Sequence, residues 1–110
     1  MQKFIIQNMG CKSNQLEGAL ITEKLVNSDY ENVKKIEDAD IFILNSCSVT
    51  HKSDNEALYI LRHAKHKNPN ITTILTGCVA QLEKENLLKE DYIDIVLGND
   101  DKLNILSFLP

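Results

Sequence analysis

The stretch Ile41-Phe42-Ile43-Leu44 decides the fold. Four consecutive large apolar residues indicate a strand that is buried on both faces, because a strand with one solvated face would alternate apolar and polar side chains. Further strands are predicted at residues 4–6, 30–33, 71–75 and 93–97, of which the segment 30–33 has the weakest pattern. Strands of this kind, separated by intervals long enough for helices, indicate a parallel sheet.

Helices are predicted in the intervals between these strands. Two of them have capping signals at their start, Asn14 with Glu17 and Ser53 with Glu56. Asn68-Pro69 ends the second of these helices. The four expected helices cover residues 14–29, 53–68, 79–88 and 98–108. The apolar face of the first is expected to comprise Leu16, Ala19, Leu20, Leu25 and Val26.

Together these elements predict an α/β fold of one domain over residues 1–110. The expected architecture is flavodoxin-like: a doubly wound parallel sheet of about five strands with helices on both faces. The strand order 2-1-3-4-5 of that fold makes the first, third and fourth strands neighbours.

Composition limits the class of protein. The 110 residues include twelve basic and sixteen acidic ones, and the formal net charge of -4 is unfavourable for holding nucleic acid alone. No apolar stretch approaches the roughly 20 residues that span a bilayer, so no membrane partner is expected. The N-terminus lacks the pattern of a signal peptide, which predicts a cytoplasmic location with reduced thiols. The three cysteines are an odd number, which argues against a disulfide framework.

The cysteines share one position relative to the predicted sheet. Cys11 follows the first strand, Cys47 the third and Cys78 the fourth, and ligands of open α/β sheets bind at this carboxyl edge. Three thiolates are one ligand short of a structural zinc site, but they suit a 4Fe-4S cluster with one open iron. A cysteine taken singly is commonly a small core residue. Their common position after adjacent strands instead favours one shared metal site.

The sequence around each cysteine resembles a known family. The three segments are Gly10-Cys11-Lys12-Ser13-Asn14-Gln15, Asn45-Ser46-Cys47-Ser48-Val49-Thr50 and Thr76-Gly77-Cys78-Val79-Ala80-Gln81. They resemble, in order, the signature segments of the N-terminal domain of radical-SAM methylthiotransferases, and the resemblance covers residues 1 to about 98. It implies that Cys11, Cys47 and Cys78 are the metal ligands that bind an auxiliary 4Fe-4S cluster.

One branch of this family is favoured by the residues near Cys47. The stretch 47–54 and the start Gly10-Cys11-Lys12 resemble the enzymes that act on threonylcarbamoyladenosine beside the tRNA anticodon. Ser13 and His51 depart from that branch. The alternatives are the branches that act on isopentenyladenosine in tRNA or on a ribosomal protein.

The resemblance also implies parts that this chain lacks. Family members continue into a radical-SAM domain, with a C-x-x-x-C-x-x-C motif for a second 4Fe-4S cluster that cleaves S-adenosylmethionine, and into a C-terminal RNA-binding domain. The motif does not occur among these 110 residues. The resemblance therefore implies a tRNA methylthiotransferase in the full-length protein, whose radical-SAM domain is a partner of this domain. The fragment alone is expected to be inactive and to bind tRNA weakly or not at all, and no catalytic residue is assigned within it.

Other interpretations of the same residues stay open. The cysteines also suit a zinc-stabilised or metal-sensing module, and a flavodoxin-like nucleotide-binding domain with incidental thiols is a third alternative. His63 and His66 fall on the polar side of the second helix, which is either a solvated face or a basic strip that faces RNA. His51 is close enough in sequence to Cys47 to form a cysteine–histidine pair.

Overall fold

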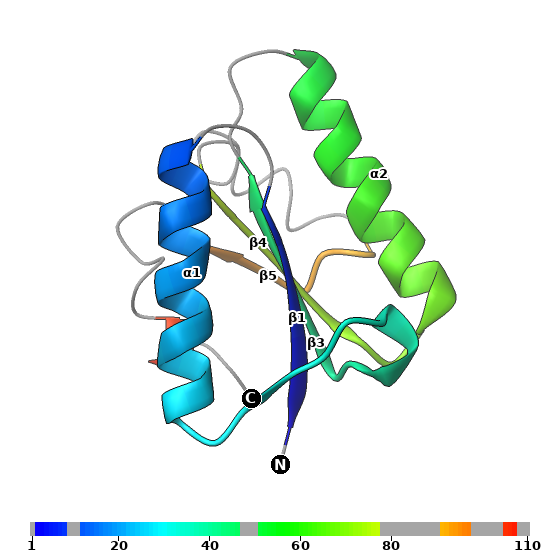
Figure 1. Ribbon diagram of the computed structural model, residues 1–110. Coiled ribbons are helices and arrows are strands. Elements are labelled where there is room, and N and C mark those ends of the chain that lie inside the picture. The colour runs from blue at the N-terminus through cyan, green and yellow to red at the C-terminus, as the bar shows by residue number, and fades with distance from the viewer. Residues whose placement is uncertain (1, 9–11, 47–50, 78–90, 98–104, 108–110) are drawn as a thin grey trace.

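The computed structural model describes residues 2–8, 12–46, 51–77, 91–97 and 105–107 (Figure 1). Its elements in chain order are β1 (Lys3–Asn8), α1 (Lys12–Asn27), β2 (Glu31–Asn32), the 3-10 turn η1 (Ile36–Asp38), β3 (Ile41–Ser46), α2 (His51–Lys67), β4 (Thr72–Gly77) and β5 (Ile95–Leu97). The predicted strands and the first two predicted helices are therefore confirmed, with shifted boundaries. The predicted helix at 79–88 lies outside the described residues.

The five strands form one parallel sheet in the order β2-β1-β3-β4-β5, as predicted. Helix α1 covers one face of this sheet and α2 covers the other (Figure 1). This is the doubly wound, flavodoxin-like α/β architecture expected from the alternating pattern. No helix in the described ranges has the length and apolar character needed to cross a membrane.

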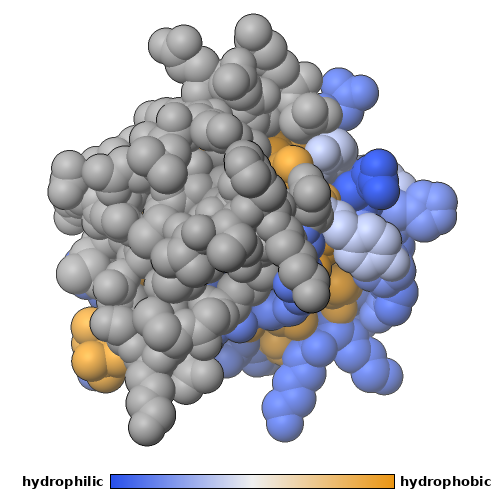
Figure 2. Space-filling view, turned by 90° about the horizontal axis from the view of Figure 1, so that it is seen from above, coloured by the Kyte–Doolittle hydropathy of each residue, from blue (hydrophilic) through white to orange (hydrophobic). Residues whose placement is uncertain are grey.

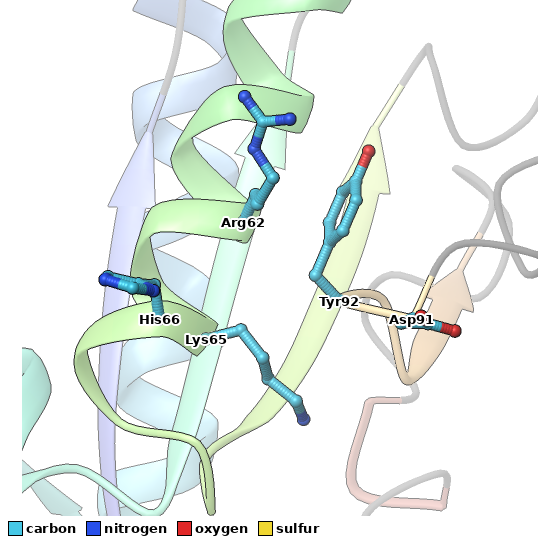
Figure 3. Close-up of a pocket in the computed structure, with 5 residues that line it drawn as sticks. All are labelled: Arg62, Lys65, His66, Asp91 and Tyr92. Carbon is cyan, nitrogen blue, oxygen red and sulfur yellow. The ribbon is translucent and has the colours of Figure 1, made fainter.

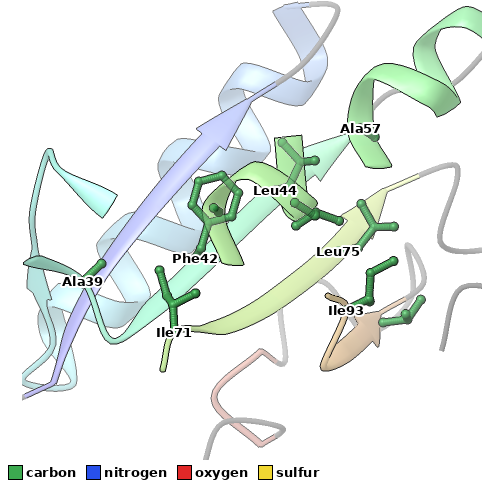
Figure 4. Packing of buried hydrophobic residues seen from close by; sticks show 10 residues of the cluster. Ala39, Phe42, Leu44, Ala57, Ile71, Leu75 and Ile93 are labelled. Carbon is green, nitrogen blue, oxygen red and sulfur yellow. The ribbon is translucent and has the colours of Figure 1, made fainter. Parts of the chain in front are cut away.

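Strand β3 divides its side chains between two apolar clusters. Ile41 and Ile43 belong to the cluster that packs against α1, together with Phe4 of β1. Phe42 and Leu44 belong to the cluster under α2 (Figure 4). The side chains of residues 41–44 are all buried. The run 41–44 is continuously apolar because both of its faces are covered, and burial of each such side chain contributes roughly 1.5–3 kcal/mol.

The predicted apolar face of α1 is largely wrong. Leu16 is 66% exposed and Leu20 is 43% exposed, whereas Ile21 and Leu25 are fully buried. Ala19 and Val26 are exposed as well. The helix instead faces the sheet with Gly18, Ile21 and Leu25, at spacings of three and four residues, which places all three on one side.

The end of α1 agrees with the prediction and has a clear cause. Asp29 adopts a positive φ of 70°, and the Tyr30 N–H donates to the Leu25 carbonyl at 3.0 Å. This bond spans the last helical turn as in a Schellman motif, in which a left-handed residue terminates the helix. The chain then turns directly into β2.

A hydrogen-bond network, called here the Asp94 network, joins the start of β4 to the segment before β5. The Asp94 carboxylate accepts from the Lys65 ammonium at 2.5 Å and from the Thr73 N–H at 2.9 Å. Lys65 also donates to the Ile71 carbonyl. Burial raises the pKa of Asp94, but the bonds from Lys65 and Thr73 together outweigh it, so the pKa lies below its ordinary value. The Asp94 network lies at the amino edge of the sheet.

Two further differences concern short segments. The turn η1 was not predicted, and it places Ala39 in the cluster under α2. Strand β5 begins at Ile95 rather than Ile93, although Ile93 is buried in the same cluster. Of the last predicted helix, only residues 105–107 are described, as a single 3-10 turn.

Candidate metal centre

The strands that precede the three cysteines end side by side. Strand β3 ends at Ser46 and β4 at Gly77, and these two residues are register partners across the sheet. Neighbouring strands lie about 4.8 Å apart, so the chain enters positions 47 and 78 from adjacent points. Strand β1 ends at Asn8 on the other side of β3. Cys11, Cys47 and Cys78 themselves lie outside the described residues, so the meeting of their sulfur atoms stays a prediction.

A polar row closes this edge of the sheet on its α1 side. Asn8, Asn45 and Thr76 are register partners in β1, β3 and β4. They follow an apolar row formed by Ile6, Ile43 and Ile74. Asn45 and Thr76 are fully buried. The polar row stands two residues before Cys47 and Cys78 in the chain and three before Cys11, so neutral amide and hydroxyl groups end the strands that lead to the predicted metal site.

Within this row, two asparagine amides contact each other. The Asn45 Nδ2 donates to Asn8 Oδ1 at 3.1 Å. The same Asn8 amide also lies against Gly18 of α1. A Cβ on Gly18 would be 1.9 Å from Asn8 Oδ1, well inside the contact distance. The absence of a side chain at Gly18 therefore lets α1 approach the end of β1 this closely.

Two helices begin at this edge of the sheet. Helix α1 begins at Lys12, directly after Cys11, and α2 begins at His51, four residues after Cys47. Helix N-termini carry partial positive charge, which favours thiolates and an anionic cluster. Soft thiolates, two helix N-termini and a neutral polar row together fit an iron–sulfur cluster. The described ranges, which exclude the cysteines, contain no other group of three His, Cys, Asp or Glu side chains suited to a metal ion.

The histidines do not join this edge as a group. His63 and His66 are exposed on the outer side of α2, which agrees with the prediction of a polar helix face. Figure 2 looks onto the molecule from above, and the side of α2 on the right is hydrophilic. His51 is the first residue of α2, and its side chain is not among those described.

Sequence reasoning missed the contribution of Asn8 and Gly18. Asn8 is a polar residue at the end of a strand whose centre, residues 4–6, is apolar. Gly18 interrupts a helix where alanine is intrinsically favoured. Either departure signals a special contact, but only the register between β1 and β3 shows that Asn45 is the partner.

The fold and this edge define a doubly wound α/β domain with a candidate metal site at the ends of three neighbouring strands. A family model described as "Uncharacterized protein family UPF0004" matches residues 3–98. The chain belongs to this family, which is the N-terminal domain of methylthiotransferases.

Curated relatives align with nearly all of the chain. The threonylcarbamoyladenosine tRNA methylthiotransferase MtaB of Aquifex aeolicus is 33% identical over 97% of this chain. The MtaB protein of Bacillus subtilis is 28% identical over 99%. The tRNA-2-methylthio-N(6)-dimethylallyladenosine synthase of Buchnera aphidicola is 36% identical over 98%. The chain spans only about a quarter of the length of these relatives, namely 26%, 24% and 24%.

Proposed function

We propose that this chain is the auxiliary iron–sulfur domain of a tRNA methylthiotransferase, in which Cys11, Cys47 and Cys78 bind a 4Fe-4S cluster. The observation that carries the proposal is the adjacency of the three strand ends, above all the register pair Ser46 and Gly77. The relatives are named for tRNA methylthiolation, and this supports the same class of reaction for the full-length enzyme.

Under this proposal, the chain's own residues hold and orient the cluster. Three cysteine ligands leave one iron without a protein ligand, and the bound cluster supplies sulfur at that position. The pair Asn8 and Asn45 ties together the strand ends that precede Cys11 and Cys47. The N-termini of α1 and α2 stabilise negative charge at the site.

The substrate in the proposal is threonylcarbamoyladenosine beside the tRNA anticodon. The stretch 47–54 supports this choice. The relatives also include enzymes named for dimethylallyladenosine at similar identity, so the isopentenyladenosine branch is the alternative. The radical-SAM domain, its own 4Fe-4S cluster and S-adenosylmethionine belong to the full-length enzyme, which we place in the cytoplasm with tRNA as its partner.

Anaerobic reconstitution with iron and sulfide tests the cluster directly. The 110-residue chain should bind about four iron and four sulfide ions, and alanine variants of Cys11, Cys47 and Cys78 should each lose them. His63→Ala, on the outer face of α2, is the matched control and should retain full iron. Stoichiometric zinc without sulfide would instead identify a zinc-binding or metal-sensing module.

The branch is tested separately, on the full-length enzyme with two RNA substrates. Anticodon stem-loops carrying threonylcarbamoyladenosine or isopentenyladenosine are incubated with S-adenosylmethionine, reductant and sulfide. Mass spectrometry should detect a methylthio group on the first RNA. Modification of the second RNA alone would assign the enzyme to the isopentenyladenosine branch, and the assignment of the cluster would not change.

A further inference from the structure

Helix α2 presents a stripe of four exposed side chains that the proposed metal site does not use. Tyr59, Arg62, His63 and His66 are spaced by three and four residues and therefore share one face of the helix. We call these four residues the α2 stripe. Of the α2 side chains that the structure describes, residues 56–67, the buried ones are Ala57, Leu61 and Ala64.

The stripe combines a flat aromatic surface with a hollow. The rings of Tyr59 and His63 are stacked, with centroids 6.1 Å apart and an interplanar angle of 9°. Tyr59 is 60% exposed although its ring is largely apolar. The four residues line a hollow of about 210 Å³. A second hollow of about 250 Å³ adjoins it, with Arg62 and His66 in both linings (Figure 3).

Among the described cations near the stripe, one is available to a ligand. Lys65 pairs with Asp94 at 2.5 Å, and Lys67 pairs with Glu37 at 3.3 Å. Within the described part of the chain, Arg62 forms no ion pair. Among the described residues, none that lines the first hollow is acidic, whereas Asp91 lies on the second. An anionic group is therefore favoured beside Arg62 in the first hollow.

We infer that the α2 stripe docks a single-stranded RNA segment, with a base on the Tyr59–His63 pair and a phosphate at Arg62. Exposed aromatic rings bind unpaired bases by stacking, and a guanidinium beside them binds phosphate through paired N–H groups. An acidic protein segment would use Arg62 but would gain little from the stacked rings. The inference rests on the proposed function, because a tRNA-modifying enzyme meets an unpaired RNA loop.

The position of the stripe suits a secondary contact. Helix α2 begins at the carboxyl edge of the sheet, and Tyr59 lies about 12 Å along the helix from His51. RNA that reaches the proposed cluster can continue along the outer side of α2. The acidic charge of the whole domain keeps this contact weak, so it orients RNA that the full-length enzyme holds elsewhere.

NMR titration of the 110-residue chain with a seven-nucleotide single-stranded RNA tests the inference. At low salt we expect a dissociation constant of ~10⁻⁴ M, with the largest shifts at residues 59–66. Tyr59→Ala and Arg62→Ala should each weaken binding about fivefold or more. Arg62→Ala should also reduce the logarithmic salt slope by roughly 0.7. Lys24→Ala, which removes a positive charge from α1 on the other face of the sheet, is the matched control.

Three outcomes would overturn the inference. The first is an equal loss for Lys24→Ala and Arg62→Ala, which would indicate general charge attraction. The second is binding of an oligoglutamate peptide as tight as that of the RNA and independent of Tyr59. The third is an absence of shifts on α2. Iron and sulfide counts are measured on the same variants, so any of these three outcomes in a chain that still binds the full cluster would reject the stripe while leaving the proposed function standing.

Discussion

The side-chain amide of Asn45 in β3 donates a 3.1 Å hydrogen bond to Oδ1 of Asn8 in β1, across 37 positions of the chain. Asn45 is fully buried, and the two residues are register partners. An amide buried at the end of an apolar strand needs such a partner, because its desolvation is otherwise costly. The bond therefore fixes the relative position of two strand ends, each of which leads to a cysteine.

The contact between Asn8 and Gly18 predicts an unusual result for a helix substitution. Alanine is normally favoured over glycine within a helix by about 1 kcal/mol. In Gly18→Ala, however, the new Cβ would overlap the Asn8 amide. That amide must then move and release the buried Asn45 Nδ2, and loss of such a bond costs about 1–3 kcal/mol. We expect net destabilisation of about 1 kcal/mol, measured by urea unfolding monitored by circular dichroism.

The double variant Asn8→Ala/Gly18→Ala tests the cause of this effect. Once the Asn8 amide is removed, Gly18→Ala should regain its helical advantage and stabilise the protein by up to about 1 kcal/mol relative to Asn8→Ala. An equal cost of Gly18→Ala in both backgrounds would show that the contact with Asn8 is not responsible.

Cys47→Ala should separate the metal site from the stability of the fold. The core consists of the two clusters on either side of β3, to which Phe42 and Ile43 belong, whereas position 47 lies beyond the end of that strand. The metal-free variant should unfold within about 1 kcal/mol of the metal-free wild type, yet lose the cluster absorbance after reconstitution. Full iron content in the variant would remove Cys47 from the ligand set.

The architecture follows from the sequence because β3 is buried on both faces. Its continuous apolar run predicts a covered parallel sheet, and the strand order then follows from the fold class. The buried face of α1 does not follow in this way. Apolar residues occur on more than one side of this helix: Leu16 and Leu20 are exposed, whereas Ile21 and Leu25 are buried. The pattern of apolar residues in the sequence therefore does not decide which side of α1 faces the sheet. A tertiary contact, the approach of Gly18 to Asn8, accompanies the one that is adopted.

The same division applies to the candidate site. Cys11, Cys47 and Cys78 can be singled out from sequence because each follows a recognisable strand. The support beneath them cannot, since the pairing of Asn8 with Asn45 depends on register, which differs by whole residues between equally plausible alignments of two strands.

Because of the Asp94 network, we expect the free energy of unfolding to decrease at acidic pH. Because the pKa of Asp94 in the folded chain lies below its ordinary value of 3.8, its contribution is fully present above that value. It is lost as the pH falls from about 3.8 through the lower folded pKa. The free energy of unfolding, measured by urea titration at several pH values, should therefore decrease in that range.

Asp94→Asn provides the control for this pH dependence. The variant should be less stable at neutral pH by about 1 kcal/mol, a low value because the pair with Lys65 is partly exposed to solvent. Its stability should also depend less on pH below 3.8. An unchanged slope in the variant would assign the acid sensitivity to other carboxylates.

The isolated chain should neither modify tRNA nor hold it tightly. Its net charge of -4 opposes phosphate contacts, and the single available cation of the α2 stripe provides only a weak contact. Binding of an anticodon stem-loop at near-physiological salt, measured by fluorescence anisotropy, should stay at ~10⁻⁴ M or weaker. Nanomolar binding, or methylthiolation by these 110 residues alone, would show that the domain holds more of the enzyme than we assign to it.

The parallel strand order has a consequence for how the protein matures. None of the described strands pairs with its partner through a hairpin, and the register partners that are closest in sequence are Ile74 and Ile95. Large loops must close before any of these pairings forms, which makes folding slow relative to helical or hairpin-rich domains. The strand ends that precede Cys11, Cys47 and Cys78 become neighbours only when this process is complete. Under the proposed function, the cluster is therefore inserted late, into chains that have already folded. In a nascent chain that is still emerging from the ribosome, the three thiols are far apart and each can bind iron only singly.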